Sequence, residues 1–280
     1  MTLREAAESL GVHYMTVYRY VRQGRLLATR QGTQWRVRSA DLKAFQRAQV
    51  GRRRGTTRTN VDCEAMERRM LAGDTQGAWW VVESHLGGGL DPSGVLTELI
   101  VPALESIGDR WAIGDVSVAE EHRATTVAQR VVGRLGLQFG KRGKDRGTVA
   151  LAAPSGDFHT LPVAIVADLL RWRGFNVLEL GANTPADAIG EAAAGQQRLI
   201  AVGIVSTTRG LDAAVASSVA AVRAAVPDVP IFIGGASIRS AAHVRRLGGD
   251  AWTGQSADLV VELVGRISAS PEGGGGRNVA

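Results

Sequence analysis

From Thr148 onward, short apolar runs alternate with longer amphipathic stretches, and this alternation constrains the fold more than any other feature of the chain. It is typical of buried parallel strands joined by covering helices. The pattern predicts a doubly wound parallel sheet with strands at 148–153, 176–180, 199–205 and 231–233. Helices are expected at 160–173, 185–195, 210–225, 239–247 and 256–267.

Three polar or glycine-rich loops follow strands of this predicted sheet, at 155–162, 206–208 and 234–236. Ligands of open parallel sheets bind beyond the carboxyl ends of the strands, so we expect these loops to share one rim. Each loop also has a plainer interpretation. A Gly-Gly pair permits a tight turn anywhere, and a hydroxyl can cap the following helix.

Asp157 and His159 are the most informative residues of these loops. His159 offers an imidazole at the end of the first strand, and Asp157 can accept a hydrogen bond from its other ring nitrogen. Carboxylates hold metal-binding histidines in this way, so the pair predicts a metal ligand at His159. Cys63 is the only cysteine, which excludes an internal disulfide framework and a multi-cysteine zinc site.

Residues 1–50 show the spacing of a helix-turn-helix. Thr2 to Glu5 predicts a capping box for a first helix, and a turn then leads into a second helix at 14–22. Strands at 26–30 and 35–37 would form a wing. The residues expected to face DNA are Thr16, Tyr18, Arg19 and Arg22 on the second helix, with Arg30 and Arg36 on the wing.

Positive charge is concentrated at the same end. Residues 1–60 hold 13 Lys and Arg against 3 acids, whereas the whole chain has a net charge of +6, so the remainder carries −4. Such a field suits the neutralisation of phosphates, although a basic segment can also be only a solvated surface. The stretch 51–60 is polar and basic, which predicts a linker.

Residues 61–140 are helical in pattern, with breaks that separate helices at 62–72, 75–86, 92–112 and 116–138. Four helices with short connections predict a four-helix bundle. Trp111 precedes the last break and Glu121-His122 follow it, so the three side chains could converge on one surface. Taken singly, Trp111 is more typical of a core or interface aromatic, Glu121 of a solvated helix face and His122 of a satisfied helix residue.

These motifs resemble known families. Residues 1–50 resemble the excisionase/MerR-type winged helix family, in which the second helix and the wing contact DNA. The sheet resembles the cobalamin-binding domain family, whose Asp-x-His-x-x-Gly motif supplies the lower cobalt ligand through its His. This resemblance implies that His159 binds cobalt, that Asp157 supports it, and that the nucleotide tail is contacted by Ser206, Thr208, Gly234 and Gly235.

The complete arrangement looks like that of the CarH-type light-sensing repressors. The resemblance implies adenosylcobalamin as cofactor, with Trp111, Glu121 and His122 near its upper adenosyl group. It also implies a homo-oligomer, a tetramer in the family, that binds double-stranded operator DNA in darkness and releases it in light. Two residues depart from the family. Pro162 replaces the motif's Gly, and Ala112 replaces a His that captures cobalt after illumination.

The predicted fold is therefore multidomain, α+β and α/β: a winged helix-turn-helix, a four-helix bundle and a flavodoxin-like sheet. The expected boundaries are 1–50, a linker at 51–60, a helical cap at 61–140, the sheet domain at 147–268 and a disordered tail at 269–280. We expect a cytoplasmic regulator without enzymatic activity or membrane segment. The alternatives are a cobalamin-independent MerR-like repressor and a corrinoid-carrying methyltransferase subunit.

Overall fold

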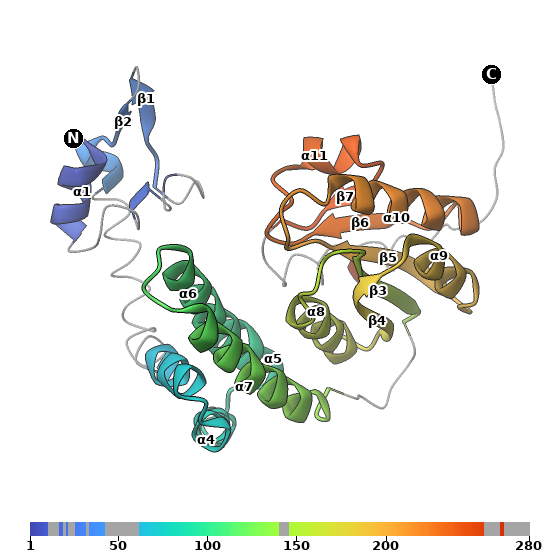
Figure 1. Cartoon of the computed structure of the whole chain (residues 1–280), viewed down its shortest axis with the longest axis horizontal. Coiled ribbons are helices and arrows are strands. Elements are labelled where there is room, and N and C mark those ends of the chain that lie inside the picture. The colour runs from blue at the N-terminus through green and yellow to red at the C-terminus, as the bar shows by residue number, and fades with distance from the viewer. Residues whose placement is uncertain are drawn as a thin grey trace. The chain divides into compact units, whose positions relative to one another are not determined.

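The chain forms two compact units, Met1–Asp62 and Cys63–Ala280, whose elements are drawn in Figure 1. None of the helices described is long and apolar enough to span a membrane. The computed structural model describes residues 1–10, 17–18, 21, 26–31, 34–42, 62–139, 146–254 and 264–265.

The first unit begins with helix α1, Leu3–Leu10. The backbone N–H of Thr2 donates to Glu5 Oε2 at 2.9 Å, and the N–H of Glu5 donates to Thr2 Oγ1 at 3.3 Å. These two bonds form the predicted capping box. Val17 and Val21 are helical and buried in a small core with α1, which confirms the inward face of the second helix.

Strands β1, Thr29–Gln31, and β2, Gln34–Arg36, pair antiparallel and confirm the predicted hairpin. The strands are shorter than the sequence pattern suggested. Residue 26 lies outside β1, because Leu26 is buried in the small core instead of extending the strand. The N-terminus braces the hairpin, since the backbones of Met1 and Val37 exchange hydrogen bonds at 3.0 Å.

The second unit opens with the helical cap, the helices within residues 62–136. A helix at 62–72 is followed by α4, Thr75–Gly87, and by one helical run from Pro92 to Ala112. Helix α7, Val118–Gly136, completes the four predicted helices. It begins two residues later than expected because Ser117 is its N-cap and forms a capping box with Glu120.

The run from Pro92 to Ala112 is not a uniform α-helix. It consists of α5, Pro92–Gly94, the π-helical segment η1, Val95–Ile100, and α6, Val101–Ala112. Pro102 has no N–H with which to donate to the carbonyl of Glu98 in a regular α-helical turn. The Sγ of Cys63 lies 3.2 Å from that carbonyl and donates to it. The lone cysteine thus supports an interrupted helix.

The sheet has the order β4-β3-β5-β6-β7, and all neighbouring strands are parallel. This is the flavodoxin-like order that we predicted. The edge strand β7 was not predicted, because two residues are too short to give a periodic signal. The strands of this sheet are β3 (Thr148–Pro154), β4 (Asn176–Thr184), β5 (Leu199–Val205), β6 (Ile231–Gly234) and β7 (Ala251–Trp252).

Helices cover both faces of the sheet (Figure 1). Side chains of β3 alternate between two cores, with Leu151 packed on the side of α8 and Ala150 and Ala152 on the side of α9 and α10. The helices are α8, Leu161–Trp172, α9, Ala186–Ala194, α10, Asp212–Ala225, and α11, Ala241–Arg246. Of the last predicted helix, only residues 264–265 are described, and they are helical.

The cap and the sheet share one hydrophobic core that runs through α8. Gln129 of α7 also donates from Nε2 to Thr160 Oγ1, just before α8, at 3.0 Å. The loop after β3 therefore lies beside the cap as well as at the rim of the sheet.

Gly203 in the centre of β5 leaves the space into which two neighbouring side chains pack. A methyl group there would collide with the Phe232 ring and with Leu151. We expect Gly203→Ala to lower the free energy of unfolding by about 1–3 kcal/mol, as overpacking does. Urea unfolding followed by circular dichroism measures the change.

The matched control is Gly133→Ala, since Gly133 is exposed in α7 and no atom lies within 4 Å of the added methyl group. Alanine is the better helix former, so this variant should gain about 0.5–1 kcal/mol. Equal loss of stability in both variants would contradict the packing argument.

Candidate functional site

His159 and Asp157 form a hydrogen-bonded pair in the loop between β3 and α8. His159 Nδ1 lies 2.7 Å from Asp157 Oδ1, and the His159 backbone N–H donates to the same oxygen at 3.2 Å. An ionised carboxylate only accepts hydrogen bonds, so Nδ1 carries a proton. Asp157 is fully buried, whereas the His159 side chain is 54% exposed. The pair therefore leaves Nε2 available, because it has no hydrogen-bond partner within the described residues.

A second loop anchors the Asp157 carboxylate. The backbone N–H groups of Thr207 and Thr208 donate to Asp157 Oδ2, and Thr208 Oγ1 donates to Oδ1 at 3.2 Å. Thr208 Oγ1 also lies 3.3 Å from His159 Nδ1. Because β3 and β5 are neighbours in the sheet, their following loops meet at this carboxylate. Thr208 thus contacts the Asp157–His159 pair directly.

The pKa values of the pair move in opposite directions. Burial opposes ionisation of Asp157, but hydrogen bonds from His159, Thr207 and Thr208 outweigh it and hold the Asp157 pKa well below its ordinary value. The hydrogen bond to Asp157 raises the His159 pKa, and burial opposes that shift. The negative charges of Asp157 and Glu121 raise the His159 pKa further. Any metal bound at Nε2 must therefore compete with a proton.

The charge of Glu121 places the first turn of α7 within electrostatic reach of His159. Glu121 Oε2 lies 2.9 Å from His122 Nδ1, and Glu121 Oε1 accepts a hydrogen bond from Thr125 at 2.8 Å. His122 is largely exposed, and Trp111 at the end of α6 is half exposed. The structure thus brings Glu121 towards His159 and leaves His122 and Trp111 accessible to solvent.

Several exposed apolar side chains lie close in sequence to these residues. Of the eight large hydrophobic side chains that are exposed in the described part of the chain, four lie within ten residues of Glu121 or His159. Phe158 directly precedes His159, and Trp111, Ile113 and Val118 lie at either end of the turn before Glu121.

The remaining predicted tail contacts lie deeper. Ser206 is buried, and its Oγ lies 2.9 Å from Ser237 Oγ. A methyl group at Gly235, which has a φ of +104°, would collide with the Ser206 backbone, and one at Gly234 would collide with Thr253. Packing within the chain is thus sufficient to require both glycines, which makes them weaker indicators of a ligand.

Two residues that support the loop escaped the sequence analysis. Asn183, with a φ of +52°, accepts a hydrogen bond from the Gly156 N–H at 2.8 Å, and its own N–H donates to the Asp157 carbonyl at 2.8 Å. Its position at the carboxyl end of β4 was a usable signal. The backbone N–H of Thr207 left no signal, because any residue except proline supplies one.

Both departures from the family pattern fall at helix ends. Pro162 lies in the first turn of α8, where a helix does not need the missing N–H. Ala112 is the last residue of α6. Neither substitution disturbs the local fold.

The structure describes part of the predicted DNA surface. Tyr18 is half-buried against the small core, which limits how far it can project. Arg30 pairs with Trp35 across the hairpin, and the Arg36 side chain is exposed on β2. Thr16, Arg19 and Arg22 lie outside the described residues.

Comparison with known families assigns a domain type to each part of the chain. Residues 1–50 match a helix-turn-helix domain, and residues 63–135 and 147–264 match two families that are both described as a B12 binding domain. The chain is CarH-like. It is 30% identical over 155 residues to the HTH-type transcriptional repressor CarH of Myxococcus xanthus, an alignment that covers 54% of this chain and 50% of that protein.

This CarH-like chain is also 27% identical over 108 residues to the trimethylamine corrinoid protein of Methanosarcina barkeri, which covers 38% of this chain and 50% of that protein. It therefore spans about half the length of the curated relatives it matches. The structure of the Methanosarcina barkeri monomethylamine corrinoid protein aligns with a TM-score of 0.62 and 16% identity, over 72% of this chain and 96% of that one. That likeness shows the fold.

The Asp157–His159 hydrogen bond predicts that the free energy of unfolding depends on pH, and this dependence can be measured in the cofactor-free chain. Because the bond raises the folded-state His159 pKa, its stabilising contribution is complete below the ordinary histidine pKa and is lost as the pH rises through the raised value. Asp157→Asn should lower the His159 pKa and remove this dependence. NMR titration of the imidazole measures the pKa.

Asp187→Asn is the control, since Asp187 is an exposed residue of α9. It should leave the His159 titration unchanged. A His159 pKa that is the same in Asp157→Asn and in the unmodified chain would show that the carboxylate does not hold the imidazole.

Proposed function

We propose that this chain is a cobalamin-dependent transcriptional regulator, a repressor whose DNA binding responds to adenosylcobalamin and to light. The observation that carries the proposal is the union of a helix-turn-helix domain with B12-binding domains in one chain, with His159 held by Asp157 at the rim of the sheet. The named CarH relative is a transcriptional repressor, which supports the same reading.

The residues at the rim fit a cobalt corrinoid. One imidazole supplies one metal ligand, so the metal must bring its other ligands with it, as cobalt in a corrin does. His159 would hold the cobalt through Nε2, and Asp157 fixes the tautomer that leaves Nε2 free. Thr208 would steady the pair and contact the nucleotide tail of the cofactor, together with the more deeply placed Ser206, Gly234 and Gly235.

The cap would cover the upper face of the corrinoid. Trp111 and the neighbouring apolar side chains would shield it from water, and Glu121 and His122 would provide polar contacts. Adenosylcobalamin supplies a light-sensitive cobalt–carbon bond when it is bound. With Ala112 at the end of α6, either the exposed His122 or water would serve in place of a histidine at residue 112, or the chain would respond differently to light or to another cobalamin form.

DNA binding would be governed by assembly of the chain. A homo-oligomer, a tetramer as in the family, would place several winged helices on one operator, so that individually weak contacts add up to tight binding. Thr16, Tyr18, Arg19 and Arg22 of the second helix, with Arg30 and Arg36 of the wing, are the proposed contacts to double-stranded DNA. The proposed regulator has a DNA-binding domain at 1–50, a linker at 51–60, a helical cap at 61–140 and a sheet domain at 147–268. We also propose that it is located in the cytoplasm.

A corrinoid-carrying subunit of a methyltransferase is the second candidate. The similarity to corrinoid proteins over the cap and sheet supports it. The helix-turn-helix match supports the regulator instead, because carrying a methyl group does not require a DNA-binding domain. A cobalamin-independent repressor is supported only by Pro162, and that residue fits the first turn of α8 without strain.

His159→Ala tests the cobalt ligand. The variant should retain adenosylcobalamin at least roughly 10–100-fold less tightly, because the axial nitrogen is lost. The visible spectrum of any corrinoid that remains bound should also shift. Equilibrium titration in darkness measures the affinity and the spectrum together.

His85→Ala is the matched control, because His85 bonds the Val81 carbonyl within α4 and belongs to no part of the proposed site. It should bind the cofactor like the unmodified chain. Undiminished binding and an unchanged spectrum in His159→Ala would refute the ligand role.

Arg36→Ala tests the wing. Loss of one phosphate contact should weaken DNA binding at all sequences and lower the slope of log K against log salt by about 1. Fluorescence anisotropy with duplex DNA at several salt concentrations measures the slope. Arg130→Ala removes the same charge from the exposed surface of α7 and should leave the slope unchanged. Equal effects of the two variants would mean that DNA binding depends on net charge and not on a specific contact from Arg36.

A further inference from the structure

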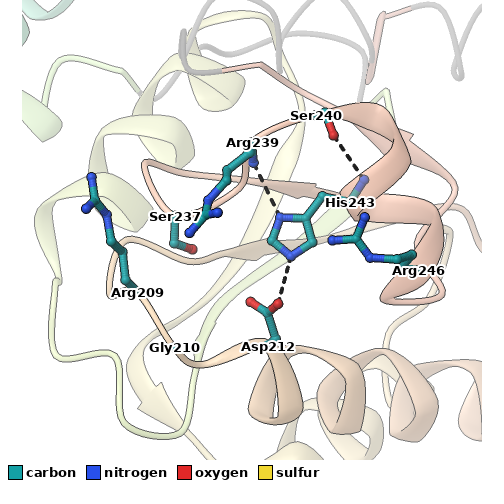
Figure 2. A pocket seen from close by; sticks show the side chains of 8 residues that line it. All are labelled: Arg209, Gly210, Asp212, Ser237, Arg239, Ser240, His243 and Arg246. Carbon is teal, nitrogen blue, oxygen red and sulfur yellow. Dashed lines mark hydrogen bonds and ion pairs between the residues drawn. The ribbon is translucent and has the colours of Figure 1, made fainter. Parts of the chain in front are cut away.

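A second concave site lies at the same rim of the sheet, over α10 and α11. It is a pocket of about 340 Å³, formed by the loop after β5 and by the loop and helix after β6 (Figure 2). We call it the arginine pocket, because its side chains include Arg209, Arg239 and Arg246. Apart from Gly210, every lining residue carries a charged or hydrogen-bonding side chain.

The arginine pocket has an excess of positive charge. Arg209, Arg239 and Arg246 are exposed, and in the part of the chain that the structure describes none of their guanidinium groups has a carboxylate partner. Asp212 is the only acid among the lining residues, and it is already engaged by His243. Two units of positive charge therefore remain for a ligand to neutralise.

The buried His243 connects two sides of the pocket through hydrogen bonds. Its Nδ1 accepts the Arg239 backbone N–H at 3.4 Å, so Nε2 carries the proton and donates to Asp212 Oδ2 at 3.0 Å. Ser240 Oγ accepts the His243 backbone N–H at 3.1 Å and keeps its own proton to donate. These bonds link the start of α10 to α11 and fix the loop that carries Arg239.

The side chains of Arg239 and Arg246 point towards this framework (Figure 2). In Figure 2 the guanidinium group of Arg246 points towards the His243 ring, and the Arg239 side chain extends between Ser237 and His243. Arg209 lies across the pocket on the other loop. Guanidinium groups from separate elements, together with a serine hydroxyl, make a set of donors, and the guanidinium groups have no carboxylate partner among the described residues.

We propose that the arginine pocket binds the phosphate groups of a small phosphorylated ligand. Planar guanidinium groups bind phosphate oxygens in pairs, and charge-assisted hydrogen bonds are the strongest that side chains form. The volume lies at the lower end of the range of about 300–1,000 Å³ for small-molecule sites, which suits a diphosphate or a mononucleotide. None of the lining residues is Ala, Val, Leu or Ile, so the charged phosphate is the part of the ligand that these side chains favour.

The pocket is separate from the proposed corrinoid site but touches its support. Ser237 lines the pocket, and its hydroxyl donates to the Ser206 carbonyl and lies against Ser206 Oγ, both at 2.9 Å. Its hydrogen-bonding capacity is thus directed towards the loop that anchors Asp157. Arg239, which would bind the phosphorylated ligand together with Arg246, is two residues from Ser237 in the sequence. The ligand would therefore bind close to the Ser237–Ser206 contact.

Calorimetric titration of the cofactor-free, full-length chain with inorganic pyrophosphate at constant ionic strength tests the proposal. The variants are Arg239→Ala and Arg246→Ala, and each should weaken binding at least about tenfold through the loss of charge-assisted hydrogen bonds. Arg245→Ala is the control, because Arg245 is the exposed neighbour in α11 and does not line the pocket. It should change the affinity less than twofold. Circular dichroism spectra confirm that each variant is folded.

Absence of pyrophosphate binding would overturn the proposal, as would an equal loss in Arg245→Ala, which would mean that the general surface charge attracts the anion. Displacement of pyrophosphate by cobalamin, but not by cobinamide, would show that the pocket serves the cofactor's own phosphate, and would also overturn a separate site. Because the titration is done without corrinoid, its failure would leave the proposed regulator untouched.

Discussion

The site depends on the hydrogen bonds that the buried Asp157 carboxylate accepts. An unpaired carboxylate at this depth would cost several kcal/mol, so it has to collect donors, and the donors come from two loops. Through them it fixes the His159 imidazole and joins the ends of two neighbouring strands. The ring orientation, the free Nε2 and the closeness of the two loops all follow from satisfying one charge.

The sequence predicted what periodicity and local chemistry determine. Alternating apolar runs predicted the doubly wound parallel sheet, and the spacing of Asp157 and His159 was enough to predict their hydrogen bond. The capping box at Thr2 and Glu5 was equally local. Features that depend on distant residues were missed or incomplete: the edge strand β7, the turn of Asn183 that supports the Asp157 loop, and the π-helical segment η1, whose Glu98 carbonyl accepts a hydrogen bond from Cys63.

Tertiary structure also changed the meaning of single residues. Gly234 and Gly235 were predicted as tail contacts, but their missing side chains make room for Thr253 and for the Ser206 backbone. His243 carried no pattern in the sequence, yet its bonds to Asp212 and Arg239 organise a cationic pocket. Both proposed sites use the loops after β5 and β6, which the contact between Ser206 and Ser237 joins.

The central claim is that one chain converts the state of a corrinoid into a change of assembly. The most direct measurement adds adenosylcobalamin in darkness, records the visible spectrum and the size-exclusion mass, and repeats both after green light. The account predicts uptake of the corrinoid, a spectral change on illumination and a simultaneous change in mass. Failure to take up the corrinoid, or a light-induced spectral change without any change in mass, would contradict it.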